Sequence, residues 1–343
     1  MKKPFFTSEE EELIKQQAPK AEAAGTFTPK LLQLAERKKL FHLSVPESMG
    51  GHEMPVPNQL DFYEEASRLD GSFGWTVKLG AGAGLFSAFM DQEFARKIFR
   101  NPAAFTAGSG YPAGTAKYTG EGTYRINGRW KYISGIHHAT LFTANCRVEN
   151  RTNNPANEPE IRAMAFLPDE IEKLDTWRSF GLKASASHDF SVTDLEISEE
   201  RSFVLEPRPE HEGKPLFHYP FMGYAPAAIA SSILGMTFAF LDEAEQHIGQ
   251  PLTIRESIER LHHNRTTLHD SVSQLWKECS DTLQGSQARI SRVNKTASSL
   301  AQTCRETALE TYKLSGMKVL DETSRFNRTW RDLMTASQHT MVN

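Results

Sequence analysis

The segment GRWKYISGIHHA, residues 128–139, has the residue types and spacing to hold a planar ring. A glycine turn leads into an aromatic strand, and Ser134 and Gly135 stand where that strand must bend. Such a bend exposes backbone amides and a hydroxyl, which could hydrogen-bond to a heteroaromatic ligand stacked against the strand. Trp130 and Tyr132 fit an ordinary hydrophobic core equally well, so the segment alone leaves both interpretations open.

Histidines form the second group of candidates. His339 follows the last helical pattern, and an imidazole there could act as an acid or a base near neutral pH, although a lone histidine is usually an ordinary surface residue. His262, His263 and His269 share one helical pattern. No H-E-x-x-H motif or cysteine accompanies them, so we expect a solvated or partner-facing helix surface and no metal site.

The glycine-rich segment GAGAG, residues 80–84, superficially resembles a dinucleotide-binding loop. No β-branched strand precedes it, a helical pattern runs from Phe73 to Met90, and no acidic residue follows at the distance that would read a ribose. The segment therefore predicts close packing between helices.

The composition is that of an ordinary globular protein: 343 residues, 39% hydrophobic, with a formal net charge of -4. This charge provides no basic field for nucleic acid or anionic lipid, so we expect small-molecule partners and no membrane. Cys146, Cys279 and Cys304 form no C-x-x-C pair, which argues against a disulfide framework or a zinc ribbon. No apolar segment follows the opening MKKPFF, so we expect a cytoplasmic protein.

The elements that must position these residues follow from the hydrophobic spacing. The helical period dominates to about residue 100, interrupted by the Pro- and Gly-rich loop at 45–58, and strand-like alternation follows. A polar loop is expected at 151–160, and the apolar stretch 225–241 is too short to span a membrane and predicts a buried core helix. Helical patterns then return at 221–249, 255–282, 286–315 and 322–338.

The sequence therefore predicts an α+β fold in three parts. These are an N-terminal α-helical domain at 1–100, an antiparallel β domain, either a sheet or a barrel, at 101–207, and a C-terminal four-helix bundle at 208–343.

Five segments in order resemble the acyl-CoA dehydrogenase superfamily. They are VPESMGG (45–51), AGSGYPAG (107–114), GRWKYISGIHHA (128–139), WRSFGLKASASHDFSVTDLEIS (177–198) and RTWRDLMTASQH (328–339). Each is a loose match, but together they span almost the whole chain. The resemblance implies the same three-part fold, a flavin held between the β domain and the bundle, and a homotetramer.

The superfamily holds two chemistries, and the last of these segments helps to choose between them. Many dehydrogenases follow the R-D pair with a catalytic glutamate, whereas here Arg331 and Asp332 lead to His339. A histidine at this place resembles the flavin-dependent monooxygenase branch, whose oxygenase components take reduced flavin from a separate flavin reductase. The R-x-Q-F-G segment that holds FAD in dehydrogenases is also absent, with Arg255 the nearest candidate. The resemblance thus favours reduced FMN, with FAD possible.

From this resemblance we expect Ser134 to hydrogen-bond flavin N5 and so to slow the collapse of the flavin peroxide to H2O2. We expect His339 to act on substrate and O2. His339 would serve either as the base toward a phenolic substrate or as the partner and proton donor of the flavin-bound oxygen. The expected cofactor contacts are Thr106, Gly108, Ser109, Trp130, Ser134, Gly135, Arg325 and Arg331. Ser109, His137 and His138 are expected to line the substrate pocket, and Arg325 and Arg331 fit ion pairs within the bundle at least as well as a flavin phosphate.

Two other functions remain open from the sequence. One is an acyl-CoA dehydrogenase whose base comes from another helix, with Glu243, Glu245 and Glu256 as the candidates. The other is a flavin-binding relative without catalytic activity.

Overall fold

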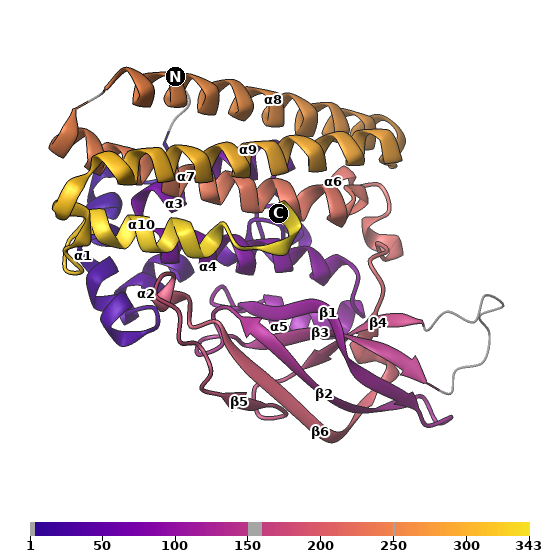
Figure 1. The fold of residues 1–343 in the computed structure, drawn as a ribbon. Helices are drawn as coiled ribbons and strands as arrows, with labels where there is room; N and C mark the ends of the chain where they lie inside the picture. Colours follow the sequence, from indigo (N-terminus) through magenta and orange to yellow (C-terminus); the bar gives the residue numbers. More distant parts are fainter. Residues whose placement is uncertain (1–3, 150–159, 250) are drawn as a thin grey trace.

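The computed structural model describes residues 4–149, 160–249 and 251–343 of the chain. The polar loop expected at 151–160 lies almost entirely outside the described residues. A group of helices, a twisted sheet and a long helical bundle follow one another along the chain (Figure 1).

The N-terminal part consists of α-helices separated by short turns. Two of them show why they begin where they do: the Thr7 side chain caps α1 in a reciprocal capping box, and Asp70 caps α4 by accepting from the backbone N–H of Phe73. The α-helices are α1 (Ser8–Ala24), α2 (Pro29–Arg37), α3 (Val56–Leu69), α4 (Gly71–Ala83) and α5 (Gln92–Phe99). Short 3-10 helices lie between them at η1 (Leu40–His42), η2 (Glu47–Met49) and η3 (Gly84–Ala88).

The GAGAG segment lies at the end of α4 and packs closely, as predicted. A Cβ added at Gly80 would stand 2.4 Å from the Phe105 ring, and one added at Gly82 would stand 3.1 Å from the Tyr224 ring. These glycines let α4 approach both the β domain and the bundle, so α4 lies at the centre of the molecule.

The strands of the described residues fall between residues 106 and 203 and form one seven-stranded sheet in the order β5-β6-β2-β1-β3-β4-β7. Its pairings are antiparallel except that of β1 with β3, which is parallel because the chain crosses from β2 to the far side of β1. The strands are β1 (Thr106–Tyr118), β2 (Thr123–Ile133), β3 (Leu141–Glu149), β4 (Ile161–Phe166), β5 (Glu172–Leu174), β6 (His188–Ser198) and β7 (Ser202–Phe203). Two 3-10 helices, η4 (Lys183–Ser185) and η5 (Glu199–Arg201), lie in the connections.

Four long helices follow, and their bounds agree with the predicted ranges to within three residues. They are α7 (Phe221–Ile248), α8 (Leu252–Thr282), α9 (Gln287–Leu314) and α10 (Arg325–Ala336). The short elements η6 (Pro209–His211) and α6 (Pro215–His218) lead into the bundle, and η7 (Gly316–Leu320) and η8 (Thr340–Val342) flank α10.

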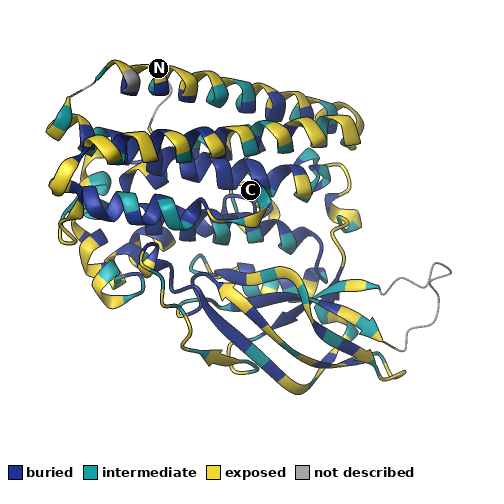
Figure 2. Cartoon of the chain, in the orientation of Figure 1, coloured by how far each residue is buried: buried dark blue, intermediate teal, exposed yellow. Residues whose placement is uncertain are grey.

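Helix α7 is the core helix that the apolar run predicted. It is the one described helix long and apolar enough to cross a membrane, but 94% of its most apolar window is buried inside the protein. Figure 2 shows it dark along its length, with the exposed faces of α8 and α9 outside it. Its burial is that of a helix at the centre of a folded core.

Candidate functional site

The strand β2 ends at Ile133, and the next two residues make the predicted bend. Gly135 has φ +78°, a conformation that glycine adopts readily, and its N–H donates to the Ser185 carbonyl oxygen at 2.7 Å. This turn brings the Ser134 hydroxyl inside the protein, where the residue is 6% exposed. The Phe105 ring packs against Gly135, so the start of β1 lies beside the same bend.

The Ser134 hydroxyl belongs to a row of hydroxyls. Its Oγ lies 2.7 Å from Ser187 Oγ, which lies 2.6 Å from Ser185 Oγ, and Ser185 donates to the Leu182 carbonyl oxygen at 2.7 Å. All three serines are buried. The row fixes the position of the Ser134 oxygen.

Helix α4 supplies the next side chain of the site, Trp75. Its indole Nε1 donates to Ser134 Oγ at 3.3 Å, which links the N-terminal helices to the β domain. The centroid of the Trp75 ring lies 5.8 Å from that of His339. The two predicted catalytic residues, 205 positions apart in the numbering, therefore both contact one buried indole.

His339 is well anchored at the start of η8. Arg305 of α9 donates to the Ser337 carbonyl oxygen at 2.9 Å, and Val342 is buried at the end of the segment. The His339 Nδ1 accepts from the Met341 backbone N–H at 3.3 Å. Burial, with a smaller contribution from the charge of Lys78, lowers the pKa of His339 to about 4. The imidazole is therefore neutral at pH 7.

Lys78, one turn after Trp75 on α4, also belongs to this site and was not predicted. The residue is 3% exposed, its ammonium Nζ lies 3.7 Å from the centroid of the Trp75 ring, and burial lowers its pKa to about 7. The sequence held one signal of it, because Lys78 is the single charged residue in the segment GSFGWTVKLGAGAGL.

The predicted flavin contacts on β1 have mixed roles. Thr106 is buried and its Oγ1 has no hydrogen-bond partner among the described residues, so it can still bind a ligand. A Cβ at Gly108 would lie 2.1 Å from the Thr143 carbonyl oxygen, so glycine is needed there for the close approach of β1 and β3. Ser109 is half-buried, and its Oγ accepts from the Tyr111 N–H at 3.3 Å.

Trp130 fits the core interpretation that the sequence left open, and its contact with a flavin stays a prediction. Trp130 is fully buried in the β domain, where its Nε1 donates to the Asn145 carbonyl oxygen at 3.0 Å and its ring lies 5.0 Å from that of Phe190. Its neighbour Tyr132 is instead 69% exposed and has φ +65°. A bulge in β2 turns Tyr132 outward, so it is the aromatic face that this strand offers to a ring.

The neighbouring histidines His137 and His138 lie in different surroundings. His138 packs into an apolar cluster, with ring centroids 5.3 Å from Phe27 and 4.8 Å from Phe105, and burial lowers its pKa to about 4. His137 is exposed, and its ring lies 5.1 Å from that of His188. Neither contacts Trp75 or His339 through any interaction seen among the described residues, so their place in the substrate pocket stays a prediction.

The two arginines fit the ion-pair interpretation. Arg325 Nη1 lies 2.7 Å from Glu243 Oε1, and its Nη2 donates to the Arg68 carbonyl oxygen. Arg331 pairs with Glu22 and donates to the Phe180 carbonyl oxygen at 2.6 Å. With these partners both guanidinium groups hold the helices together.

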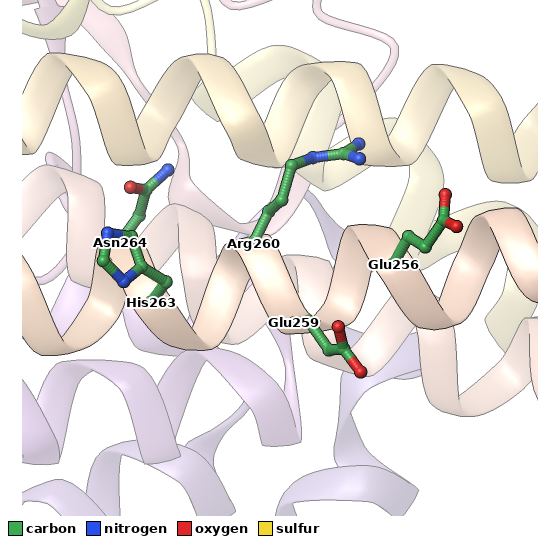
Figure 3. A pocket seen from close by; sticks show the side chains of 5 residues that line it. All are labelled: Glu256, Glu259, Arg260, His263 and Asn264. Atoms are coloured by element: carbon green, nitrogen blue, oxygen red, sulfur yellow. The ribbon is translucent and has the colours of Figure 1, made fainter.

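The glutamates that would have to replace the dehydrogenase base lie elsewhere. Glu243 is held by Arg325, and Glu245 and Glu256 are exposed on α7 and α8. Figure 3 shows Glu256 with Glu259, Arg260, His263 and Asn264 around a hollow on α8. This hollow is formed by side chains of one helix and is open to solvent, so we assign the site to the enclosed residues around Trp75.

Comparison with known proteins finds similar chains along most of this sequence. Residues 8–103 match the family model described as acyl-CoA dehydrogenase, N-terminal domain, and residues 227–343 match acyl-CoA dehydrogenase, C-terminal domain. The chain is 25% identical over 323 residues to an indole-3-acetate monooxygenase of Pseudomonas putida, covering 88% of this chain and 80% of that protein.

Two further similar proteins are described with a flavin. The chain is 22% identical to the oxygenase subunit HsaA, a flavin-dependent monooxygenase of Rhodococcus jostii, over 69% of this chain and 63% of that protein. The fold also matches the structure of XiaF from Streptomyces in complex with FADH2, with a TM-score of 0.82 and 21% identity, covering 97% of this chain and 89% of that one.

Proposed function

We propose, from the premise that this chain belongs to the acyl-CoA dehydrogenase superfamily and to its flavin-dependent monooxygenase branch, that it oxidises a small aromatic or heterocyclic substrate. It does so as the oxygenase component, with reduced flavin, O2 and a separate flavin reductase. The observation that carries the proposal is that His339 and Ser134 both contact the buried Trp75 and that the imidazole of His339 is neutral. The resemblance expects the base of a dehydrogenase, a glutamate, in this segment.

The residues around the bend fit a flavin ring. The unpartnered Thr106 hydroxyl, the Ser134 oxygen and the exposed Tyr132 ring would hold it. We favour FMN over FAD because Arg325 and Arg331, the two arginines expected at a flavin phosphate, are held by Glu243 and Glu22. When bound in reduced form, the flavin supplies electrons to O2 and passes one oxygen atom to the substrate. The chain's own contribution is to orient the ring, exclude water and supply a proton.

His339 is suited to supply that proton. Its Nδ1 accepts a hydrogen bond from Met341, so in the neutral ring the hydrogen sits on Nε2. An Nε2–H can donate to oxygen, which favours the role of proton donor over that of base. The nearby charge of Lys78 opposes a second proton on the ring and keeps it neutral.

The test of the proposal is oxygen consumption and product formation with an added NADH:flavin reductase, across a panel of phenols and nitrogen or sulfur heterocycles. His339→Ala should lower hydroxylation by about 100-fold or more while flavin binding is retained, because proton transfer by a positioned side chain contributes about 100- to 10,000-fold. His263→Ala, on the exposed face of α8, is the matched control.

Full hydroxylation by His339→Ala would exclude this role. If an acyl-CoA instead bleached the oxidised, FAD-loaded protein without oxygen, the chain would be a dehydrogenase.

We also propose, on the resemblance, that the chain forms a homotetramer. Light scattering would detect it as four times the chain mass of 38.6 kDa.

A further inference from the structure

Lys78 is a buried amine with no anion beside it in the described part of the chain. Its pKa of about 7 leaves it about half protonated at pH 7, and a bound oxyanion would favour the ammonium form. Its Nζ is shielded from solvent and has no hydrogen-bond partner in the part of the chain that the structure describes. No aspartate or glutamate within that part forms an ion pair with it, and the face of the Trp75 ring lies 3.7 Å from Nζ. Other buried cations of this protein do have partners: Arg331 pairs with Glu22, and Arg328 lies 3.6 Å from Asp70.

An unpaired buried ammonium is costly, because burial removes water and returns no opposite charge. The face of an indole offsets part of that cost, but an oxyanion offsets more. Methionine would fill the same volume without the cost, so packing alone gives no reason for lysine here. The amine also lies in the site itself, since Trp75 contacts both Ser134 and His339.

We infer that the substrate is an aromatic compound with an oxyanion substituent, a carboxylate or a phenolate, and that Lys78 binds this group beside Trp75. The inference rests on the proposed function, because it assumes that the enclosed site receives the substrate. Lys78 is then a residue that determines specificity, while His339 and Ser134 face the reacting atoms. The ammonium gains the partner that the protein itself does not provide.

The experiment measures binding by calorimetry to the full chain, under anaerobic conditions at pH 7, with and without reduced FMN. The probes share one ring system and differ in charge: 2-naphthylacetate, its neutral amide 2-naphthylacetamide, and 2-naphthol. We expect the wild type to bind the acetate about 10- to 100-fold more tightly than the amide, the range for a hydrogen bond to a charged group. A phenolate site would instead show the preference for 2-naphthol.

Lys78→Met should remove this preference while binding of the amide stays unchanged, and Lys78→Arg should keep most of it because the charge is retained. Lys97→Met, on the exposed face of α5, is the control and should bind like the wild type. Thermal unfolding checks the fold, and Lys78→Met should be no less stable than the wild type, since it removes an unpaired buried charge.

Three results would overturn the inference: equal binding of acetate, amide and naphthol by the wild type, an unchanged preference in Lys78→Met, or weaker binding of reduced FMN as the only effect of that variant. The last would assign Lys78 to the flavin. Because these are binding measurements, they separate this inference from the proposed function, which fails only if no probe or panel compound is oxygenated.

Discussion

At the scale of single residues, the site depends on polar groups whose partners are few and defined. Ser134 is held by Trp75 and Ser187, and His339 by the Met341 amide. Lys78 has no such partner among the residues that the structure describes. The two groups proposed to face the flavin and oxygen are thus fixed, and the one proposed to face the substrate is free to bind.

Replacing Ser134 with Ala should increase the fraction of NADH whose electrons form H2O2 instead of hydroxylated product. Release of H2O2 takes the hydrogen from flavin N5, and the Ser134 oxygen bonded to that hydrogen would hold it back. Loss of one such bond corresponds to about a 2- to 10-fold faster release. A peroxidase-coupled assay run beside NADH consumption measures it. The exposed Ser280→Ala is the control, and unchanged coupling in Ser134→Ala would remove the assigned role.

Sequence reasoning placed Ser134 and His339 but not their surroundings. Period-2 alternation puts Trp130 and Tyr132 on one face of β2. Between the pairs Trp130–Phe190 and Ile133–His188, however, two residues of β2 oppose one residue of β6. This bulge sends Tyr132 outward, and no local pattern announces it. Lys78 was missed for a related reason: its importance comes from Trp75 and His339, which the fold alone brings beside it.

At the scale of elements, helix contacts depend on small residues. The long helices α7 to α10 were predictable because their apolar spacing is regular. Both ends of each of these helices lie within three residues of the predicted ends. How they pack was less predictable. Gly235 of α7 shows the constraint, because a Cβ there would lie 2.2 Å from the Glu64 carbonyl oxygen of α3.

Gly235→Ala should therefore destabilise the protein by about 1–3 kcal/mol, since the backbone of α3 must move away. The clash must exceed the gain of about 1 kcal/mol that alanine brings to a helix interior. Thermal or urea unfolding measures the difference, with Gly213→Ala as the control, where an added Cβ meets no atom within 4 Å. A variant as stable as the wild type would show that α3 and α7 are loosely packed.

At the scale of the whole molecule, the three parts meet around Asp332 of α10. Its Oδ1 accepts from the Leu182 backbone N–H at 2.6 Å, and its Cβ would lie 2.6 Å from a Cβ added at Gly71 of α4. Burial, and then the neighbouring Asp70 carboxylate, raise the pKa of Asp332 to about 8. The bundle, the β domain and the N-terminal helices therefore share one buried carboxyl group that is largely protonated at pH 7.

This carboxyl group makes stability depend on pH. A carboxyl group whose pKa is raised by folding contributes its full stability below the unfolded value near 4, and the contribution is lost as the pH rises through about 8. Asp332→Asn cannot lose a proton, so the melting temperature of the wild type should fall relative to this variant between pH 6 and pH 9. The exposed Asp169→Asn should follow the wild type. Parallel curves for the wild type and Asp332→Asn would contradict the assignment.

The hydrogen bonds in the row of serine hydroxyls all run in one direction. Each hydroxyl has one hydrogen, and Ser185 gives its own to the Leu182 carbonyl, so Ser187 must give its hydrogen to Ser185 and Ser134 must give its hydrogen to Ser187. Ser134 is left with a lone pair for a ligand and no hydrogen. Reduced flavin carries a hydrogen on N5 and oxidised flavin carries none, so the orientation of these hydroxyls favours one redox state of the cofactor.

In Ser187→Ala the Ser134 hydroxyl loses its acceptor, so its hydrogen becomes free to bind a ligand. The ratio of the affinity for oxidised FMN to that for reduced FMN should therefore rise by about 2- to 10-fold over the wild type. Flavin fluorescence, measured with and without oxygen, gives both affinities, and an unchanged ratio would mean that the row can reverse. A changed ratio would show that the redox preference of the site depends on Ser187, which lies 53 residues from Ser134 in the sequence.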